Sequence, residues 1–389
     1  MGNIVIGLGN TGYQIIKVIA NDPVLNDVKL YAIDSVTTDA DLDIVNRVNI
    51  IPIISDDVSG SGRNRDRGAE MFIIHENDGA FDQMYKDIEN AKEPVLIITS
   101  SAGGTGSGSC VPLCKSLVAK GITPIPIIIT PNMSDPDAYH LNTNDLFAGL
   151  GEIVNVVDGM AQAGVPSYSI FQNPKNTANY DNINKDVVNL VEIILGKRYK
   201  STDADSIDES DLLTVLRTPG RFIAVSAKAT NVDILRKEIT KKVFSGYQPA
   251  WSNEDASKYT LMTAYALSSM FAGDEFDTVF EDIRKRIPHW FDEYRNIAPL
   301  DTDGMSEAIV IISGLPRTEV KDIDTEYNLV DGLGEGIKKS VRPSFIKRSK
   351  IIPQASVNKK PTGSGVPSTV SAKEQNGDAD TLKKYNLTE

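Results

Sequence analysis

Short apolar runs alternate with helical periodicity along the first third of the chain. Runs of this kind, with few polar interruptions, are typical of parallel strands that helices cover on both faces. They predict an α/β fold with a doubly wound, mostly parallel sheet. The expected strands are residues 3–9, 28–34, 48–53, 94–100 and 122–130.

A long amphipathic pattern follows, from about Asn182 to about Tyr199. Its apolar positions recur every three or four residues and form one wide face, which predicts a helix that joins two domains. Beyond it, three further strands alternate with helical segments and indicate a second, smaller α+β domain. These strands are expected at 221–229, 258–267 and 307–315, with helices near 231–244 and 274–287.

The end of the chain has a different composition, rich in Pro, Gly, Ser, Thr and Lys. Such a segment buries too little apolar surface to offset the entropy of ordering, so we expect a flexible, basic tail. We therefore divide the chain into a first domain at 1–179, a central helix at 180–200, a second domain at 201–342, and a helix end with the tail at 343–389.

Length and charge narrow the class of protein. A chain of 389 residues exceeds the roughly 250 residues that one core usually supports, which favours two domains. The net charge of −13 disfavours direct binding of the folded body to DNA or to an anionic membrane, so a DNA link would need an adaptor. The sequence shows no membrane-spanning run and no signal peptide, and we expect a cytoplasmic protein.

The cysteines and histidines do not indicate a metal site. Cys110 and Cys114 are four residues apart, which places them on one helix face as buried apolar residues rather than as a CxxC pair. His75, His140 and His289 are scattered without metal-ligand spacing. We expect all five side chains to be structural.

The first glycine-rich turn follows the first expected strand directly. Gly7, Gly9 and Gly12 have GxGxxG spacing, which exposes main-chain N–H groups and a helix N-terminus to a phosphate. Asp34 ends the next strand, where a dinucleotide fold keeps the acid that binds a ribose hydroxyl. Taken alone, this half of the chain favours a nicotinamide-dependent oxidoreductase.

A second glycine loop changes that interpretation. Residues 100–109, SSAGGTGSGS, follow another strand and lead into an apolar helix. Successive amides at a helix start can approach several phosphate oxygens, and the helix dipole favours their charge. The loop lacks the GK[ST] of a Walker motif, so magnesium and amides must neutralise the phosphates.

Residues 102–108, AGGTGSG, resemble the GGGTGSG signature of the tubulin and FtsZ superfamily. The resemblance extends in order along the chain, is greatest to the TubZ segregation family, and implies a GTPase that binds GTP or GDP with Mg²⁺. It implies a nucleotide site made of Gly9, Asn10, Thr11, Gln14, Asp34, Gly62, Arg63, Asn64, Ala102, Gly103, Gly104, Thr105, Gly106, Ser107, Asp135, Asn173, Tyr180 and Asn184.

Individual roles follow from the same resemblance. Gln14 falls where the family contacts the base, and Asp34 falls near the magnesium, which it would reach through water, so no direct protein ligand is expected. The segment 60–65 corresponds to the loop that senses the γ-phosphate, but its arginines depart from the family pattern. Whether Arg63 contacts the terminal phosphate is left open. Asp135 corresponds to the ribose-side loop.

Asn173, Tyr180 and Asn184 resemble the residues that read guanine in the family. The four-residue spacing of Tyr180 and Asn184 places ring and amide on one helix face, where they can stack on a purine and bind its edge. A lone tyrosine at this place would otherwise be expected to pack between helices.

An acidic segment, residues 206–212 (SIDESDL), is similar to the NxDxxD motif of FtsZ, with serine replacing asparagine. The resemblance implies that Asp208 and Asp211 act as catalytic acids on the nucleotide of the next subunit and that the chain forms a homopolymer filament. Carboxylates suit this step because they can orient water in line with the γ-phosphate. The alternative is a solvated acidic loop.

Three functions remain open on this evidence. The first is a filament-forming GTPase, plasmid- or phage-encoded, that segregates DNA through a TubR-like adaptor bound to its tail, without direct membrane contact. The second is an FtsZ-like division scaffold, which the polar end LKKYNLTE disfavours. The third, from a different class, is the NAD-dependent oxidoreductase.

Overall fold

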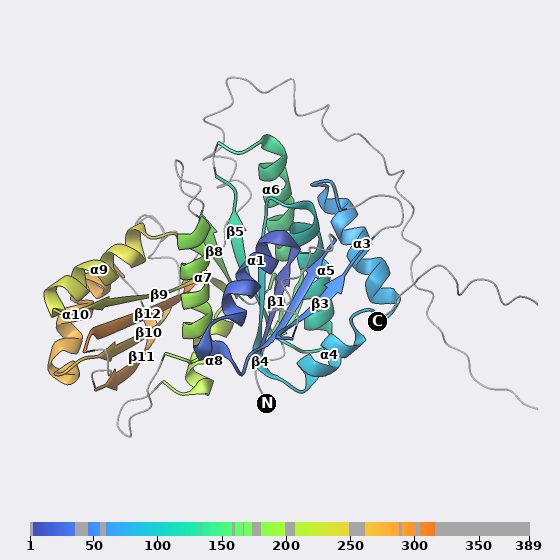
Figure 1. Cartoon of the computed structure of the whole chain (residues 1–389). Coiled ribbons are helices and arrows are strands. Elements are labelled where there is room, and N and C mark those ends of the chain that lie inside the picture. The colour runs from blue at the N-terminus through green and yellow to red at the C-terminus, as the bar shows by residue number, and fades with distance from the viewer. Residues whose placement is uncertain are drawn as a thin grey trace, which may run out of the picture. The chain divides into compact units, whose positions relative to one another are not determined.

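One ten-stranded sheet runs through the protein in this computed structural model (Figure 1). A separate hairpin pairs β6 (Val154–Val157) with β7 (Met160–Ala163). Across the large sheet, the strands in order are β11 (Trp290–Ala298), β10 (Leu261–Ser268), β12 (Ser306–Leu315), β9 (Gly220–Ala229), β8 (Ser167–Gln172), β5 (Pro124–Thr130), β4 (Lys92–Ser100), β1 (Asn3–Leu8), β2 (Lys29–Asp34) and β3 (Val48–Pro52).

The structure describes residues 3–35, 46–54, 60–132, 134–157, 160–165, 167–172, 180–198, 207–248, 261–287, 290–299 and 304–315. They belong to one unit, Met1–Gly332. Asn173, His289 and the predicted tail lie outside the described residues. Within the described part, no helix is both long and apolar enough to cross a membrane.

The N-terminal half is a parallel sheet with helices on both faces. Strands β3, β2, β1, β4, β5 and β8 are all parallel to their neighbours. Successive side chains of a strand point to opposite faces, and Val5 accordingly lies in one core cluster while Ile4 and Ile6 lie in another. The helices of this half are α1 (Gly9–Ala20), the 3-10 turn η1 (Pro23–Leu25), α3 (Arg65–Asn77), α4 (Asp82–Glu89), α5 (Gly104–Ala119) and α6 (Asp137–Gly151).

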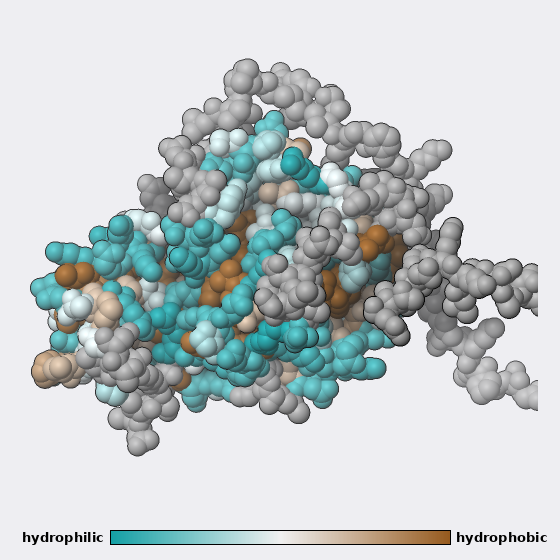
Figure 2. All heavy atoms as spheres, in the orientation of Figure 1, coloured by the Kyte–Doolittle hydropathy of each residue, from teal (hydrophilic) through white to brown (hydrophobic). Residues whose placement is uncertain are grey.

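Helix α7 (Tyr180–Ile194) connects the two halves of the sheet. Its Val187 and Val191 share a core cluster with Ile15 of α1 and with Phe222 of β9. Figure 2 shows a mostly hydrophilic surface on one face of the molecule, with apolar atoms visible between α1 and α7. The helix therefore joins both halves, as the amphipathic pattern predicts.

The C-terminal half continues the sheet with mixed strand directions. β12 is antiparallel to β9 and β10, whereas β11 is parallel to β10. The helices of this half are α8 (Glu209–Arg217), α9 (Val232–Ser245) and α10 (Ala272–Arg286). Among the described residues, β8 pairs with β9 through Ser167 with Gly220 and Tyr168 with Arg221, which makes the junction between the halves short.

The fold class is confirmed, including the five N-terminal strands, while two local expectations are wrong. β3 is an edge strand that pairs with β2 alone, and Asn49 and Ile50 are exposed, so helices do not cover it on both faces. The central helix ends at Ile194 rather than near residue 199, because Gly196 adopts φ +67° and its N–H closes the last turn on Ile193 O. The division into domains stays a prediction.

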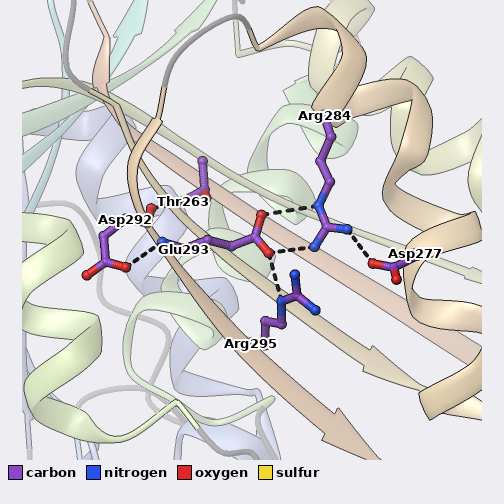
Figure 3. A network of polar contacts seen from close by, with 6 residues as sticks. All are labelled: Thr263, Asp277, Arg284, Asp292, Glu293 and Arg295. Carbon is purple, nitrogen blue, oxygen red and sulfur yellow. Dashed lines mark hydrogen bonds and ion pairs between the residues drawn. The ribbon is translucent and has the colours of Figure 1, made fainter.

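A polar network fastens α10 to the outer strand β11 (Figure 3). Glu293 accepts from Arg284 at 2.5 and 3.1 Å and from Arg295 at 2.8 Å. Arg284 also binds Asp277, and its guanidinium lies 5.3 Å from the ring centroid of Tyr265. Bidentate, partly buried pairs of this geometry contribute more than exposed ion pairs, so the network orders this end of the sheet.

A second network lies at the C-terminal end of α7. Arg198 binds Glu192 at 2.9 Å and Glu307 of β12 at 2.5 Å, which connects α7 to the C-terminal half. Burial raises the pKa of Glu192 to about 7, and a hydrogen bond with Asp22 adds to the rise, while Arg198 opposes it. Between about pH 4.5 and pH 7, the Glu192 carboxylate therefore takes up a proton when the chain folds.

This raised pKa predicts a pH-dependent stability. The protonated Glu192 stabilises the fold fully below about pH 4.5, and the contribution is lost as pH rises through about 7. The glutamine of Glu192→Gln cannot ionise. The free energy of unfolding of this variant, relative to that of the original protein, should therefore increase by on the order of 1–3 kcal/mol as the pH rises from 5 to 8. Denaturant unfolding at several pH values measures the difference. Glu238→Gln, at an exposed site on α9, is the control, and equal curves for all three proteins would contradict the assignment.

Candidate functional site

The two glycine loops lie side by side at the carboxyl ends of the parallel strands. The first follows β1 and the second follows β4, and these strands are parallel neighbours with Leu8 opposite Thr99. Chain order reverses between β1 and β4, and doubly wound sheets bind ligands outside the carboxyl ends of the strands at such a switch point. The loops therefore occupy the expected ligand-binding position.

The main chains of the two loops are in contact. Gly9 has φ +66°, and a Cβ added there would lie 2.9 Å from the amide nitrogen of Gly106. A Cβ on Gly106 would lie 2.7 Å from Leu8 O. Neither position tolerates a side chain without displacing backbone, so glycine at both positions lets the loops form one continuous main-chain surface.

The other two glycines of the GxGxxG pattern have a packing role. A Cβ on Gly12 would lie 2.6 Å from Ile98 O, and one on Gly7 would lie 2.6 Å from Gly12 O. These glycines bring the start of α1 close to β1 and β4. The pattern thus combines one turn with positive φ, at Gly9, with two positions required for close packing of helix and strand.

A third loop, residues 60–64, packs against the second. A Cβ on Gly104 would lie 2.4 Å from Ser61 Oγ and 2.6 Å from Asn64 N. Buried hydroxyls connect the same region, because Thr105 Oγ1 lies 2.5 Å from Ser35 Oγ and donates to Ser61 Oγ at 3.0 Å. This chain of hydroxyls joins the ends of three separate segments.

Asn142 of α6 holds the second and third loops together. Its Nδ2 donates to Arg63 O at 3.0 Å and to Ala102 O at 2.9 Å, and the side chain is buried. Thr143, the next residue, exchanges a 2.8 Å hydrogen bond with Ser101. Sequence reasoning missed Asn142, since a single asparagine within a helix has no distinguishing pattern.

Two helix N-termini meet at this surface without side-chain caps. Leu8 is the N-cap residue of α1 and Gly103 is that of α5, and neither supplies a side-chain hydrogen bond to its helix. Gly103 has open space around its Cβ position, with no atom within 4 Å. Uncapped amides and two helix dipoles attract anions, so the surface suits several phosphate oxygens.

The polar residues predicted around the loops are partly engaged with one another. Asn64 caps α3 by accepting from Arg67 N at 3.1 Å, and the Asp135 carboxylate accepts from Asn132 N at 2.7 Å. Gln14 is exposed and donates to Asn10 at 3.3 Å. Their contacts with a nucleotide, like those of Thr11, Gly62 and Ser107, stay predictions.

The donors near the loops fit a magnesium ion. Asp34 is buried, and its carboxylate accepts from Ser35 N at 2.7 Å. With the hydroxyls of Ser35, Ser61 and Thr105 it forms a set of oxygen donors only, which is the chemistry that Mg²⁺ prefers, usually with several waters retained. Within the described part of the chain, no cluster of three or more His, Cys, Asp or Glu forms a metal cage.

Cys110 and Cys114 are fully buried on α5, as predicted, and His75 and His140 make main-chain contacts. Tyr180, the first residue of α7, is 55% exposed, so its ring does not pack between helices. Asn184 follows one helical turn later and is partly buried. The exposed ring fits the predicted stacking role better than the packing role.

The predicted catalytic acids lie at the opposite end of the parallel strands, near the amino ends of β1 and β4. Asp208 and Asp211 begin α8 and form a capping box, with Asp208 Oδ1 accepting from Asp211 N at 2.8 Å. Asp208 lines a cavity of about 320 Å³ together with Asn3 and Glu93, the starts of β1 and β4. A strand the length of β1 spans roughly 20 Å, so the acids do not reach the loops of their own chain.

The capping box revises the interpretation of this segment as a loop. An acid followed three residues later by another acid, just before an apolar run, is a helix-start pattern. The spacing of Asp208 and Asp211 therefore carries a structural signal that the sequence reading did not use. Asp208 is nevertheless exposed.

Adjacent glycines of the second loop should respond differently to alanine. Gly104→Ala places a Cβ against Ser61 and Asn64 and should destabilise the fold by about 1–3 kcal/mol. Gly103→Ala enters open space at a permitted φ of −75° and should leave stability within about 0.5 kcal/mol. Thermal and denaturant unfolding of both variants measure this, and equal losses would contradict the described packing.

Strand order alone does not exclude a dinucleotide enzyme. The order β3-β2-β1-β4-β5-β8 is also that of the dinucleotide-binding fold. This chain differs from the dinucleotide-binding fold in three features. A second glycine loop packs against the first, α7 connects the two halves of the sheet, and the C-terminal half has mixed strand directions. The fold as a whole is therefore not the dinucleotide-binding fold on which the oxidoreductase alternative depends.

Comparison with known proteins gives matches in structure alone. No family model matches the sequence, and no curated protein matches it either. CetZ2 from Haloferax volcanii, in a GTPγS-bound protofilament, has a TM-score of 0.65 at 16% identity, over 85% of this chain and 99% of that chain.

Structures of TubZ and FtsZ match this chain with similar TM-scores. TubZ of Bacillus thuringiensis serovar israelensis, in a GTPγS-form protofilament, has a TM-score of 0.61 at 16% identity, over 87% of this chain and 94% of that one. FtsZ of M. jannaschii has a TM-score of 0.60 at 15% identity, over 83% and 91%. These values do not separate the branches, and the fold of this chain is that of the tubulin and FtsZ superfamily.

Proposed function

We propose that this protein is a GTPase that assembles head to tail into filaments and hydrolyses GTP at the contacts between subunits. One observation carries the proposal: two helix N-termini without side-chain caps lie together at the carboxyl ends of β1 and β4, whereas Asp208 and Asp211 lie near the amino ends of these strands. A single chain supplies each half of such a site but cannot bring the halves together.

The first half binds the nucleotide. The amides around Gly9 and Gly103–Ser107 hold the phosphates, because helix dipoles and unpaired N–H groups replace the lysine of a P-loop. Tyr180 stacks on the guanine, and Asn184 with Asn173 binds its edge, while Gln14 approaches from α1. Asp34 would hold a hydrated magnesium ion, and the ion would supply positive charge that neutralises the phosphates.

The second half completes hydrolysis from the neighbouring subunit. Asp208 and Asp211 orient a water in line with the γ-phosphate, and phosphoryl transfer depends mainly on such positioning. Two similar structures, CetZ2 and TubZ, are protofilaments with GTPγS, which supports head-to-tail association with a bound guanine nucleotide. A repeated contact between unlike surfaces that does not close generates an open filament.

We propose further that the filament segregates plasmid or phage DNA in the cytoplasm through a DNA-binding, TubR-like adaptor. The acidic body, with a net charge of −13 for the whole chain, repels DNA. Lysine and arginine outnumber acidic residues in the segment 343–389, and this positive charge would steer an acidic partner.

A complementation experiment tests catalysis between subunits. Asp208→Asn keeps an N-capping side chain but removes the carboxylate, so folding is retained while GTP turnover should fall at least 100-fold. Gly103→Ala should fold but obstruct the phosphates. Neither variant turns over GTP alone, whereas an equal mixture should recover activity, because the acids of the second reach the nucleotide of the first.

Two results would count against this mechanism. Full activity of Asp208→Asn by itself would remove the carboxylate from the chemistry. A mixture that is no more active than its two components would place nucleotide and acids in the same subunit. Glu209→Gln, next to Asp208 on α8, is the matched control and should keep its turnover.

The role of the tail is tested separately. A chain that ends at Pro353 should polymerise with unchanged critical concentration, because it keeps the whole of both predicted domains, the second of which is expected to end at residue 342. The shortened chain should no longer pull down a complex of adaptor and DNA, which co-sedimentation with preformed filaments measures. Equal capture by the full and shortened chains would rule out this role for the tail.

A further inference from the structure

The carbonyl groups at the start of the second glycine loop are held from inside the protein. Asn142 Nδ2 donates to Ala102 O at 2.9 Å, and Ser107 Oγ donates to Gly103 O. Both side chains are buried, and they reach the loop from helices, Ser107 from α5 and Asn142 from α6. Two consecutive carbonyl groups are therefore turned toward the core.

Planarity of the peptide bond then sets the direction of the Gly103 amide. In a trans peptide, the carbonyl of one residue and the N–H of the next residue point in opposite directions. The Ala102–Gly103 peptide is trans, so the N–H of Gly103 is turned outward when Ala102 O is turned inward. No atom lies within 4 Å of the Cβ position of Gly103. This amide is therefore a donor that faces open space just before α5.

Glycine makes this peptide plane easy to invert. Rotating the Ala102–Gly103 peptide by half a turn changes ψ of Ala102 and φ of Gly103, which is −75° in the structure. The inverted plane would give Gly103 a positive φ, which glycine adopts readily. A carbonyl oxygen would then replace the N–H donor at the phosphate surface. Its partial negative charge would repel the anion that the donor attracts.

Asn142 opposes this inversion. Its Nδ2 group has two protons, and they bind two carbonyl oxygens, those of Ala102 and Arg63, at 2.9 and 3.0 Å. Turning the side-chain amide would break both bonds, so the Asn142 donor stays opposite Ala102 O. The main-chain hydrogen bond that Ser101 donates to β5 holds the preceding residue and leaves the Ala102–Gly103 plane free. Among the described residues, Asn142 is the one side chain that binds this carbonyl.

We propose that Asn142 holds the Ala102–Gly103 peptide in the orientation that directs the Gly103 N–H at a phosphate group of the bound nucleotide. Asn142 is a positioning residue, because it contacts the loop and acts on the ligand only through the main chain. The inference rests on the proposed nucleotide site and specifies how one of its donors is held. Without Asn142, the same loop presents a mixture of donor and acceptor to the phosphate.

The first test measures the affinity of the full chain for GTPγS by isothermal calorimetry, at protein concentrations below assembly. Asn142→Ala removes both donors and should lower this affinity about tenfold or more. Thr143→Ala is the matched control, because it removes the buried 2.8 Å hydrogen bond between α6 and Ser101 while the Ala102 carbonyl stays bound. The affinity of this control should change less than about twofold.

A second measurement separates positioning of the peptide from a general loosening of α6. In the full chain with isotope-labelled glycine, the NMR signal of the Gly103 amide is identified by its absence in Gly103→Ala. This signal should shift on GTPγS binding in the original protein and in Thr143→Ala. Asn142→Ala should move the signal before nucleotide is added and should reduce its shift on binding.

Other outcomes separate this proposal from the proposed function. Unchanged GTPγS affinity in Asn142→Ala, with normal binding by the original protein, would overturn the role of Asn142 alone. Equal losses in Asn142→Ala and Thr143→Ala would also overturn it. If the original protein does not bind GTPγS, the proposed function itself fails. Should Asn142→Ala not fold, Asn142→Ser takes its place with the same expected loss, because its short hydroxyl binds a carbonyl of its own helix instead of the loop.

Discussion

The contact between the main chains of the two glycine loops determines what this fold can bind. Gly9 and Gly106 approach so closely that a methyl group at either would meet backbone atoms. This contact aligns two helix N-termini at the switch point of the sheet and creates one surface of amides rather than two. The third loop completes the surface, since Asn142 and the hydroxyls of Ser35, Ser61 and Thr105 fix it to the second.

A second constraint is the distance between the carboxyl ends and the amino ends of the parallel strands. Helix α7, with 15 residues, spans roughly 22 Å, with Tyr180 at its start and the acids of α8 beyond its end. One chain therefore cannot bring Asp208 to a nucleotide held by its own loops. If the acids act on GTP, they act on a neighbour, and assembly and turnover become one process. The Arg198–Glu307 ion pair and the network around Glu293 connect the elements of the half of the sheet that follows α7.

Much of this arrangement could be predicted from the sequence because it depends on local patterns. Apolar runs gave the parallel strands, and glycine spacing gave the loops with their order along the chain. The exposed edge of β3 could not be predicted, since its residues are as apolar as those of covered strands and only the pairing leaves it at the edge. The Asn142 clamp depends on a contact between residues far apart in sequence. The end of α7 could have been predicted from Gly196, and the capping box from the three-residue spacing of Asp208 and Asp211.

The rate of GTP hydrolysis per subunit, followed as the protein is diluted, tests the division of the site most directly. The account predicts a rate near zero at low concentration and a steep rise at the concentration where light scattering first detects polymer. Gly103→Ala should abolish the activity at every concentration, while Glu209→Gln should leave the profile unchanged. A constant rate per subunit across the dilution series would contradict the claim that two molecules build each active site.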